Sequence, residues 1–435
     1  MGIQAFPASL VPIIQTNMLE REFQDALQSV TAFRSIADRE EFSIGIGETI
    51  TKTRRGLKAP VTTPLTPSTN TNLDNGLTPA GWTVEQYSLA LNMYADTIDL
   101  NMVTSRVGLA SQFLQNANVN GVQAGQSLDR IARNTLFNAH LGGNTRVRTT
   151  LGAPGTALTV DDIRGFQNVF VNGVLVPVSA GAPMTVTVGS NSYTLQTAVA
   201  DGSNVSTAPN GVSGVLNFSG NVTVADGTAL NAVVSAVAPS ILRAGGRSTT
   251  AGLVGTDLLT MGLCLDAVAQ LRNNNVPTID GLYNCYLDNK SARQLFTDPD
   301  FKLLFQGANA SEAFRTGRVV ELLDLRFIPT TEAYQQTLGA VNVKRPIVCG
   351  KGALIEGDFA ATGYSDVATE NALMQMVDGI AMVTREPLDR LAQIIAQSWY
   401  WIGGFCVPTD LTANTTIIPT ANNSYYKRAI VLETA

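Results

Sequence analysis

The chain has 435 residues, of which 15% are charged, and its formal net charge is −6 at pH 7. This length corresponds to about two to four domains with separate cores. The negative balance argues against a protein whose main task is to grip nucleic acid, because that task needs a basic face. The low charged fraction predicts a largely neutral surface that packs against other proteins.

Signals for export and for membrane anchoring are weak. The first ten residues, MGIQAFPASL, lack the basic and apolar regions of a signal peptide. The uncharged stretch 391–409 is the best candidate for a membrane span, but Gln393, Gln397 and Ser398 interrupt it. These polar residues favour a buried core segment instead, and we expect no membrane partner.

The N-terminal part predicts a helix followed by a long hairpin. Leu19, Phe23 and Leu27 recur at the spacing of an amphipathic helix. Apolar and polar residues then alternate, as in strands, in SIGIGETITKTRR (43–55) and again in QYSLALNMYA (86–95). The segment between these strands is rich in Pro, Thr, Asn and Gly, so we expect an irregular tip.

Two helices are predicted to follow the hairpin. Apolar residues share one face over 103–114 and again over 128–139, with an interruption at NVNGVQAGQS (118–127). The glycines of LGGNT (141–145) are placed to end the second helix.

A segment almost without charge comes next. Residues 165–242 contain no Lys, Arg, Glu or His, and their only charged residues are Asp201 and Asp226. Short β-rich runs alternate here with NG, DG and GN turns. This spacing predicts a small β-sandwich or barrel of about 80–90 residues.

Mixed α/β character is predicted for the rest of the chain. A helix is expected to start at a Thr256 or Asp257 cap and to continue past Leu271. YNCYLD (283–288) predicts a strand and NKSARQLFTD (289–298) a short helix. Further strands are expected at the positions 318–330, 345–359 and 425–433.

Groups that carry catalysis are scarce. The single histidine, His140, follows a helical run and has no acidic residue at the spacing of a catalytic pair. CGKGALIEG around Lys351 lacks the upstream glycine and the Ser or Thr of a phosphate-binding loop. The paired acids at 161–162 and at 298 and 300 fit turns and helix starts. We therefore predict a protein that is not an enzyme, with no cofactor.

The cysteine pattern favours reduced thiols in the core. The chain has four cysteines, Cys264, Cys285, Cys349 and Cys406. They lie far apart in the sequence without a CxxC pair, so we expect neither a disulfide framework nor a metal site.

A basic cluster lies on the first arm of the predicted hairpin. Its members are Lys52, Arg54, Arg55 and Lys58. Nucleic-acid binding and a solvated strand end are two interpretations, although the cluster has no interleaved aromatic residue. In a third, the arm reaches a neighbouring identical chain and meets its acidic residues, Asp38, Glu40 and Glu41. An arm without a core needs such a partner to become ordered.

The order of these parts resembles the major capsid proteins of tailed bacteriophages, which share the Hong Kong phage-type capsid fold. SIADREEFSIGIGETITKTRR (35–55) is similar to the N-arm running into the E-loop of that family, and SLDRIARNTLFNAHLGGNT (127–145) to its spine helix. YLDNKSARQLFTDPDFK (286–302) resembles a stretch of the A-domain, and REPLDRLAQIIAQSWYWIGGFCV (385–407) the segment that returns to the P-domain. These are loose patterns, and they cover nearly the whole chain except the charge-free segment.

The resemblance implies an α+β fold with six parts. These are an N-terminal arm (1–40), the E-loop hairpin (41–101), the P-domain with the spine helix (102–150), an inserted β-rich domain (151–250), the A-domain (251–380) and a return to the P-domain (381–435). About 40 residues precede the E-loop, so we expect a separate scaffolding protein or a processed precursor.

The implied function is assembly. Pentamers and hexamers of this chain are expected to form the icosahedral shell of a virion, with a scaffolding protein, a portal and a decoration protein as further partners. Packaged double-stranded DNA is expected to bind only weakly and non-specifically. Some relatives link an E-loop lysine to an asparagine of the next chain. Lys52 and Lys58 lie in the right element, but neither the asparagine nor the assisting acid can be identified.

Two rival functions predict other features. A secreted or virion-surface adhesin that binds glycans through the β-rich insertion predicts repeated β units and an export signal. A hydrolase that uses the acids near Asp298 predicts a convergent set of acid, base and nucleophile. The sequence shows one β unit, no export signal and no such set.

Overall fold

A computed structural model describes most of the chain. The described residues are 10, 18–28, 31–42, 49–55, 58, 61–62, 64, 84–102, 109–171, 174–306, 321–359, 374–385, 387, 390–391, 393–408 and 427–435. Internal contacts divide the chain into a first unit (1–51, 88–136 and 354–407) and a second unit (52–87, 137–353 and 408–435).

A long strand, β23 (Ile394–Cys406), organises the sheet of the first unit. One edge of β23 pairs with β4 (Asn92–Asn101), and the other edge is shared by β22 (Ile380–Arg385) and β20 (Leu354–Phe359). Two outer strands complete the sheet: β21 (Met374–Val377), beside β22, and β1 (Ala37–Phe42), parallel to β20.

Buried and half-buried residues alternate along β23, with Ile395, Gln397, Trp399 and Trp401 buried. This period of two is that of a strand with one face against a core. The prediction of a buried core segment at 391–409 is therefore confirmed for the inward-facing residues of β23, whereas Leu391 and Ile394 are exposed. No described helix is long and apolar enough to cross a membrane.

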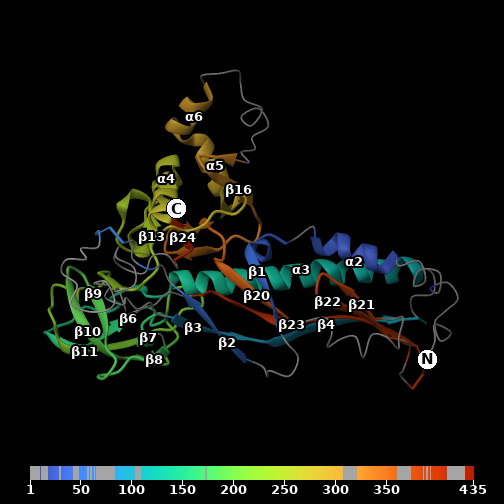
Figure 1. The fold of residues 1–435 in the computed structure, drawn as a ribbon, viewed down its shortest axis with the longest axis horizontal. Coiled ribbons are helices and arrows are strands. Elements are labelled where there is room, and N and C mark those ends of the chain that lie inside the picture. Colours follow the sequence, from blue (N-terminus) through green and yellow to red (C-terminus); the bar gives the residue numbers. More distant parts are fainter. Residues whose placement is uncertain are drawn as a thin grey trace. The chain divides into compact units, whose positions relative to one another are not determined.

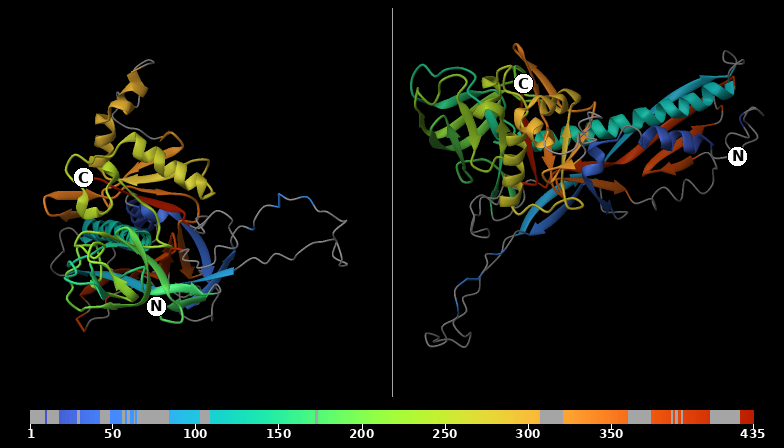
Figure 2. Two further views of the ribbon diagram at one scale, coloured as in Figure 1. Left: turned by 90° about the vertical axis from the view of Figure 1, so that its left-hand side faces the viewer. Right: turned by 90° about the horizontal axis from the view of Figure 1, so that it is seen from above.

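Two helices cover this sheet. Helix α2 (Met18–Gln28) and helix α3 (Leu109–Leu141) lie side by side over it, as Figure 1 and the right-hand view of Figure 2 show. Their apolar residues join those of β4 and β21–β23 in one core, with Phe23, Phe113 and Trp401 among its members. A short helical turn, η2 (Phe33–Ile36), leads into β1.

The predicted break between two helices at 118–127 is wrong, because α3 is continuous there. Two residues of this stretch, Asn120 and Gly121, are explained by their contacts with β23 and α2. A Cβ on Gly121 would lie 2.7 Å from the carbonyl oxygen of Phe23, so only glycine lets α2 approach this closely. Asn120 is buried and donates to the carbonyl oxygen of Gln397, 3.0 Å away. Tertiary contacts thus override the weak helix propensities of these residues.

Six strands of the second unit form a closed barrel. They are β5 (Asn144–Arg146), β12 (Ala232–Ser235), β9 (Met184–Val188), β10 (Asn191–Ala200), β11 (Gly214–Val222) and β6 (Gly155–Val160), in order of pairing. A bridge between Val147 and Val160 joins the two ends of this order. The apolar side chains inside include Leu158, Val186, Leu195 and Leu216. A hairpin of β7 (Asn168–Val171) and β8 (Val174–Pro177) accompanies the barrel.

A mixed sheet forms the α/β part of the second unit. Its strands are β13 (Ile241–Arg243), β24 (Ala429–Glu433), β19 (Ile347–Cys349), β14 (Tyr283–Leu287), β16 (Leu325–Pro329) and β15 (Glu321–Leu322). The helices of this part are α4 (Met261–Asn273), α5 (Asn289–Thr297) and α6 (Pro299–Gln306), with the short turns η4 (Ala244–Gly246) and η5 (Thr250–Gly252). A separate hairpin pairs β17 (Gln335–Leu338) with β18 (Val341–Lys344).

Helix α4 starts later than predicted. Its cap is Thr260, whose hydroxyl accepts a hydrogen bond from the amide of Leu263, whereas Thr256 and Asp257 lie before the helix. Both earlier residues resemble caps in sequence, but the side chain of Asp257 is engaged by Arg247 instead. Helix α5 begins after Asp288, which accepts from the amides of Lys290 and Ser291.

The two strands of the predicted hairpin, β2 (Thr49–Arg55) and β3 (Val84–Ala90), form a two-stranded sheet. The predicted start of the first strand, 43–48, lies outside the described residues. Most of the predicted tip does so too.

Candidate functional site: buried charge networks

The predicted basic cluster lies on and after β2. Lys52, Arg54 and Arg55 belong to that strand, and Lys58 follows it as an exposed residue. Lys52 is half-buried, and the side chains of Arg54 and Arg55 lie outside the described part.

The predicted acidic residues all lie on β1, the strand that pairs in parallel with β20. Asp38 is exposed and Glu40 is half-buried, and the side chain of Glu41 is not among those described. The acids therefore belong to an edge strand of the first unit.

A buried ion pair holds the segment before β1 against the sheet. Arg34 is 4% exposed and Glu356, on β20, is completely buried. Arg34 Nη2 lies 2.6 Å from Glu356 Oε1, and Arg34 Nη1 lies 3.2 Å from Asp378 Oδ2. Arg39 is half-exposed and adds an outer contact of 2.8 Å to Asp378. One arginine inside and one outside thus share the same two carboxylates.

The backbone of this segment is also attached to α3. The buried carboxylate of Asp129 accepts from the amides of Ala32 and Arg34, at 2.9 and 3.0 Å. Charge-assisted bonds of this kind are stronger than neutral ones. Residues 32–42 are therefore an integral part of the first unit.

The second unit contains a comparable centre at Glu433 on β24. This buried carboxylate accepts from Arg345 Nε at 3.0 Å, from Arg243 Nε at 2.7 Å and from the hydroxyl of Thr250 at 2.7 Å. Burial by itself raises the pKa of Glu433, but the two guanidinium groups and the hydrogen bonds hold it below its ordinary value. The carboxylate remains charged at neutral pH.

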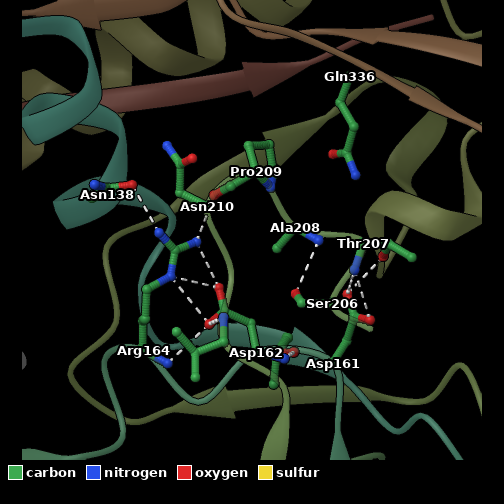
Figure 3. Close-up of polar contacts among 12 residues, drawn as sticks. Asn138, Asp161, Asp162, Arg164, Ser206, Thr207, Ala208, Pro209, Asn210 and Gln336 are labelled. Atoms are coloured by element: carbon green, nitrogen blue, oxygen red, sulfur yellow. Dashed lines mark hydrogen bonds and ion pairs between the residues drawn. The ribbon is translucent and has the colours of Figure 1, made fainter. Parts of the chain in front are cut away.

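The adjacent acids Asp161 and Asp162 follow strand β6 and organise one end of the barrel (Figure 3). Asp161 accepts from the amide and the hydroxyl of Thr207, the latter at 2.6 Å. Asp162 pairs with the guanidinium of Arg164 at 2.7 Å and accepts from the Arg164 amide, as in an Asx-turn. The predicted turn role fits Asp162. Asp161 instead accepts hydrogen bonds from Thr207, which lies 46 positions further along the chain.

Asp298 and Asp300 lie where helix starts were predicted. Asp298 precedes α6 and accepts from the amides of Asp300 and Met261, at 3.2 and 2.7 Å. Its carboxylate therefore accepts hydrogen bonds from backbone amides at the starts of both α6 and α4. Hydrogen bonds to backbone amides account for the carboxylate of Asp298.

One of the two acids in the charge-free segment, Asp226, is satisfied by donors that carry no charge, whereas Asp201 pairs with Arg148 at 2.5 Å. Asp226 accepts from the hydroxyl of Tyr193 at 2.6 Å, from Asn191 at 2.8 Å and from Thr223 at 2.9 Å. Burial raises the pKa of Asp226, but these hydrogen bonds outweigh it and hold that pKa at about 2. At Asp226, hydroxyl and amide donors thus take the place of a lysine or arginine.

Three cysteines of the α/β core are buried and unreactive. Burial raises the pKa of Cys264 to about 12 and raises those of Cys285 and Cys349 well above the ordinary range. Because the thiolate is the nucleophile and the metal ligand, these residues are core side chains. In the part of the chain that the structure describes, no three His, Cys, Asp or Glu residues are arranged to hold a metal ion.

His140 is buried in the last turn of α3, and neither ring nitrogen has a hydrogen-bond partner among the described residues. Burial lowers its pKa from 6.5 to about 4. Between these values the unfolded chain binds a proton that the folded chain does not, so stability falls as the pH drops from 6.5 towards 4.

We expect His140→Leu to remove this dependence. Between pH 7 and pH 5 the wild type should lose about 2 kcal/mol of unfolding free energy that the variant retains. Urea denaturation at the two pH values measures the difference. Equal slopes with pH for both proteins would contradict a buried, neutral His140.

The residues of the two networks are not recognisable from the sequence, because their partners are distant in the chain. Arg34 and Glu356 are 322 positions apart, and Arg345 and Glu433 are 88 apart. A weaker signal was present. Glu356 and Glu433 are lone charges within the apolar runs ALIEG and IVLET. Such a charge in a strand predicts a buried ion pair.

No family model matches the sequence, and no curated protein matches it. Solved structures do. The capsid of Ralstonia phage GP4 matches with a TM-score of 0.50 and 11% identity, over 93% of this chain and 91% of that chain. The chain has a phage capsid fold.

Two other capsid structures give similar values. The capsid of cyanophage P-SCSP1u matches with a TM-score of 0.48 and 12% identity, over 93% of this chain and 88% of that chain. The capsid of cyanophage Pam1 matches with a TM-score of 0.46 and 11% identity, over 95% and 92%. The mixed α+β fold predicted from the sequence is confirmed by the likeness to the GP4 capsid.

Proposed function

We propose that the chain is a major capsid protein, which assembles as pentamers and hexamers into the icosahedral shell around the double-stranded DNA of a tailed bacteriophage. The observation that carries this proposal is the shared fold with the GP4 capsid over 93% of the chain. A likeness over nearly the whole chain supports a function that uses the whole fold. It favours a shell protein over an adhesin, whose function needs only the β-rich part.

The elements take the following roles in the proposal. Helix α3 is the spine helix of the P-domain, and β2 with β3 forms the base of the E-loop. The sheet with α4 and α5 is the A-domain, and the barrel is an insertion. The proposed boundaries remain 1–40, 41–101, 102–150, 151–250, 251–380 and 381–435.

Buried charge networks suit a shell subunit. In a closed symmetric assembly many modest contacts add up, provided that each subunit presents its surfaces in one geometry. The networks at Glu356 and Glu433 fix distant segments of each unit in place. In the proposal, a scaffolding protein guides the subunits, a portal occupies one vertex and a decoration protein binds outside.

Expression of the protein, alone and together with candidate scaffolding genes, tests the proposal. Size-exclusion chromatography and negative-stain electron microscopy should show shells, tubes or free hexamers. A monodisperse monomer under every condition would contradict it.

The basic cluster on and after β2 is proposed to meet the β1 acids of a neighbouring copy. We expect Lys58→Glu to weaken assembly, because it places like charges opposite each other in every subunit pair. Adding Asp38→Lys to the same chain should restore assembly, since both residues are exposed and the pair regains opposite signs. The yield of shells, measured by sedimentation, reports the effect.

Lys351→Glu is the matched control, because it makes the same charge change at an exposed turn of the α/β part. If Lys58→Glu and Lys351→Glu reduce the yield equally, or if Asp38→Lys fails to rescue, the charge pairing is wrong.

A further inference from the structure

The β7–β8 hairpin beside the barrel carries apolar side chains on both of its faces (Figure 1). Its register pairs Val169 with Val176, which places these two side chains on one face. Leu175 is the neighbour of Val176 along β8, so its side chain lies on the other face.

The barrel covers one face of this hairpin at its base. Val169 belongs to the core of the barrel, and Val176 packs against that core as a half-buried residue. Nearer the turn, Val171 and Val174 lie on the same face but are 38% and 47% exposed. On the opposite face, Leu175 is 48% exposed. The outer part of the hairpin is therefore apolar and uncovered in the single chain.

The composition of the hairpin is that of a strand pair with protein on both sides. Its strands read NVFV and VLVP, and six of these eight residues are apolar. A strand with one face in water instead alternates apolar with polar residues. Neighbouring apolar side chains left in water mark an interaction surface. The pattern therefore indicates a second layer of protein over the free face.

The absence of charge identifies the partner. The hairpin has no charged residue, and in the surrounding segment 165–242 Asp201 pairs with Arg148 and Asp226 is buried. Such a surface offers nothing to attract a strongly acidic or basic partner. It can meet an identical surface, because a two-fold contact brings residues near the axis close to their own counterparts, where a charge would repel itself.

We infer that the free face of the β7–β8 hairpin packs against the same face of a second copy about a local two-fold axis, with Leu175 near the axis. The inference rests on the proposed function, which supplies identical neighbours. Two short hairpins bury far less than the about 1,200–2,000 Å² of a stable complex. The hairpins therefore meet only where a shell already holds the copies side by side, and the unassembled chain does not pair through them.

Cross-linking in assembled shells tests this inference. Leu175→Cys places a thiol near the proposed axis, and a short bis-maleimide should link most of the chains in pairs. Val199→Cys is the matched control, because Val199 is 54% exposed on β10 of the same barrel but lies outside the hairpin. This control should give few linked pairs, and so should the wild type, whose four cysteines are buried or half-buried.

Thermal unfolding of Leu175→Ser gives a second readout. The midpoint of the free chain should not change, since Leu175 is exposed there, whereas the midpoint of the shells should fall by a few degrees. Val199→Ser should change neither midpoint. Shells in which Leu175→Cys links no better than Val199→Cys, or in which Leu175→Ser unfolds like the wild type, would overturn this inference and leave the proposed function intact. A wild type that forms no shells would overturn both.

Discussion

Arg34→Met is expected to destabilise the unassembled chain by about 3–5 kcal/mol, because it leaves the carboxylate of Glu356 buried without its main partner. Glu356 is completely buried and lies 2.6 Å from Arg34. Arg39 lies 3.7 Å from Glu356 and compensates only in part. Urea denaturation, followed by far-UV circular dichroism, measures the loss.

Two companion variants separate charge from packing. The double variant Arg34→Met with Glu356→Met should recover most of the loss, because well-packed apolar residues replace a buried pair at little cost. Arg39→Met makes the same side-chain change at a half-exposed position, and it should cost about 0–1 kcal/mol. If Arg34→Met and Arg39→Met cost the same, the Arg34–Glu356 pair is not buried.

Gly121→Ala is expected to destabilise the packing of α2 on α3 by about 1–3 kcal/mol. In a free helix this change stabilises by about 1 kcal/mol, since alanine is the better helix former. Here the added Cβ would lie 2.7 Å from the carbonyl oxygen of Phe23 and 2.9 Å from Cβ of Ala26. The backbone of α2 must move away, which should increase hydrogen exchange over residues 18–28.

Gly262→Ala provides the matched control. Gly262 is also helical, but it is exposed, and the nearest atom to its added Cβ is the hydroxyl oxygen of Thr260 at 4.0 Å. This variant should be neutral or more stable by up to about 1 kcal/mol. A Gly121→Ala protein that gains stability in the same way would contradict the contact between α2 and α3.

Strands were predictable where one face is buried, because burial imposes a period of two on the sequence. The alternating stretch QYSLALNMYA (86–95) is an example, because all of its residues except Leu91 lie in β3 and β4. The short helix predicted at 289–298 was also found, as α5, with Asp288 as its cap.

Features decided by distant contacts were not predictable. Asn120 and Gly121 are poor helix formers, and they remain helical in α3 because Gln397 and Phe23 lie against them. Closure of the barrel depends on the bridge between Val147 and Val160, which no spacing in the sequence reveals. The ion pairs of Arg34 and Arg345 join residues that only the fold brings together.

Cryo-electron microscopy of purified virions or assembled shells tests the proposed function most directly. This chain is expected to occupy every pentamer and hexamer of an icosahedral shell, in hundreds of copies, with the β2–β3 arm extending over a neighbouring subunit. A shell built from another protein, with this chain present in only a few copies or absent, would contradict it.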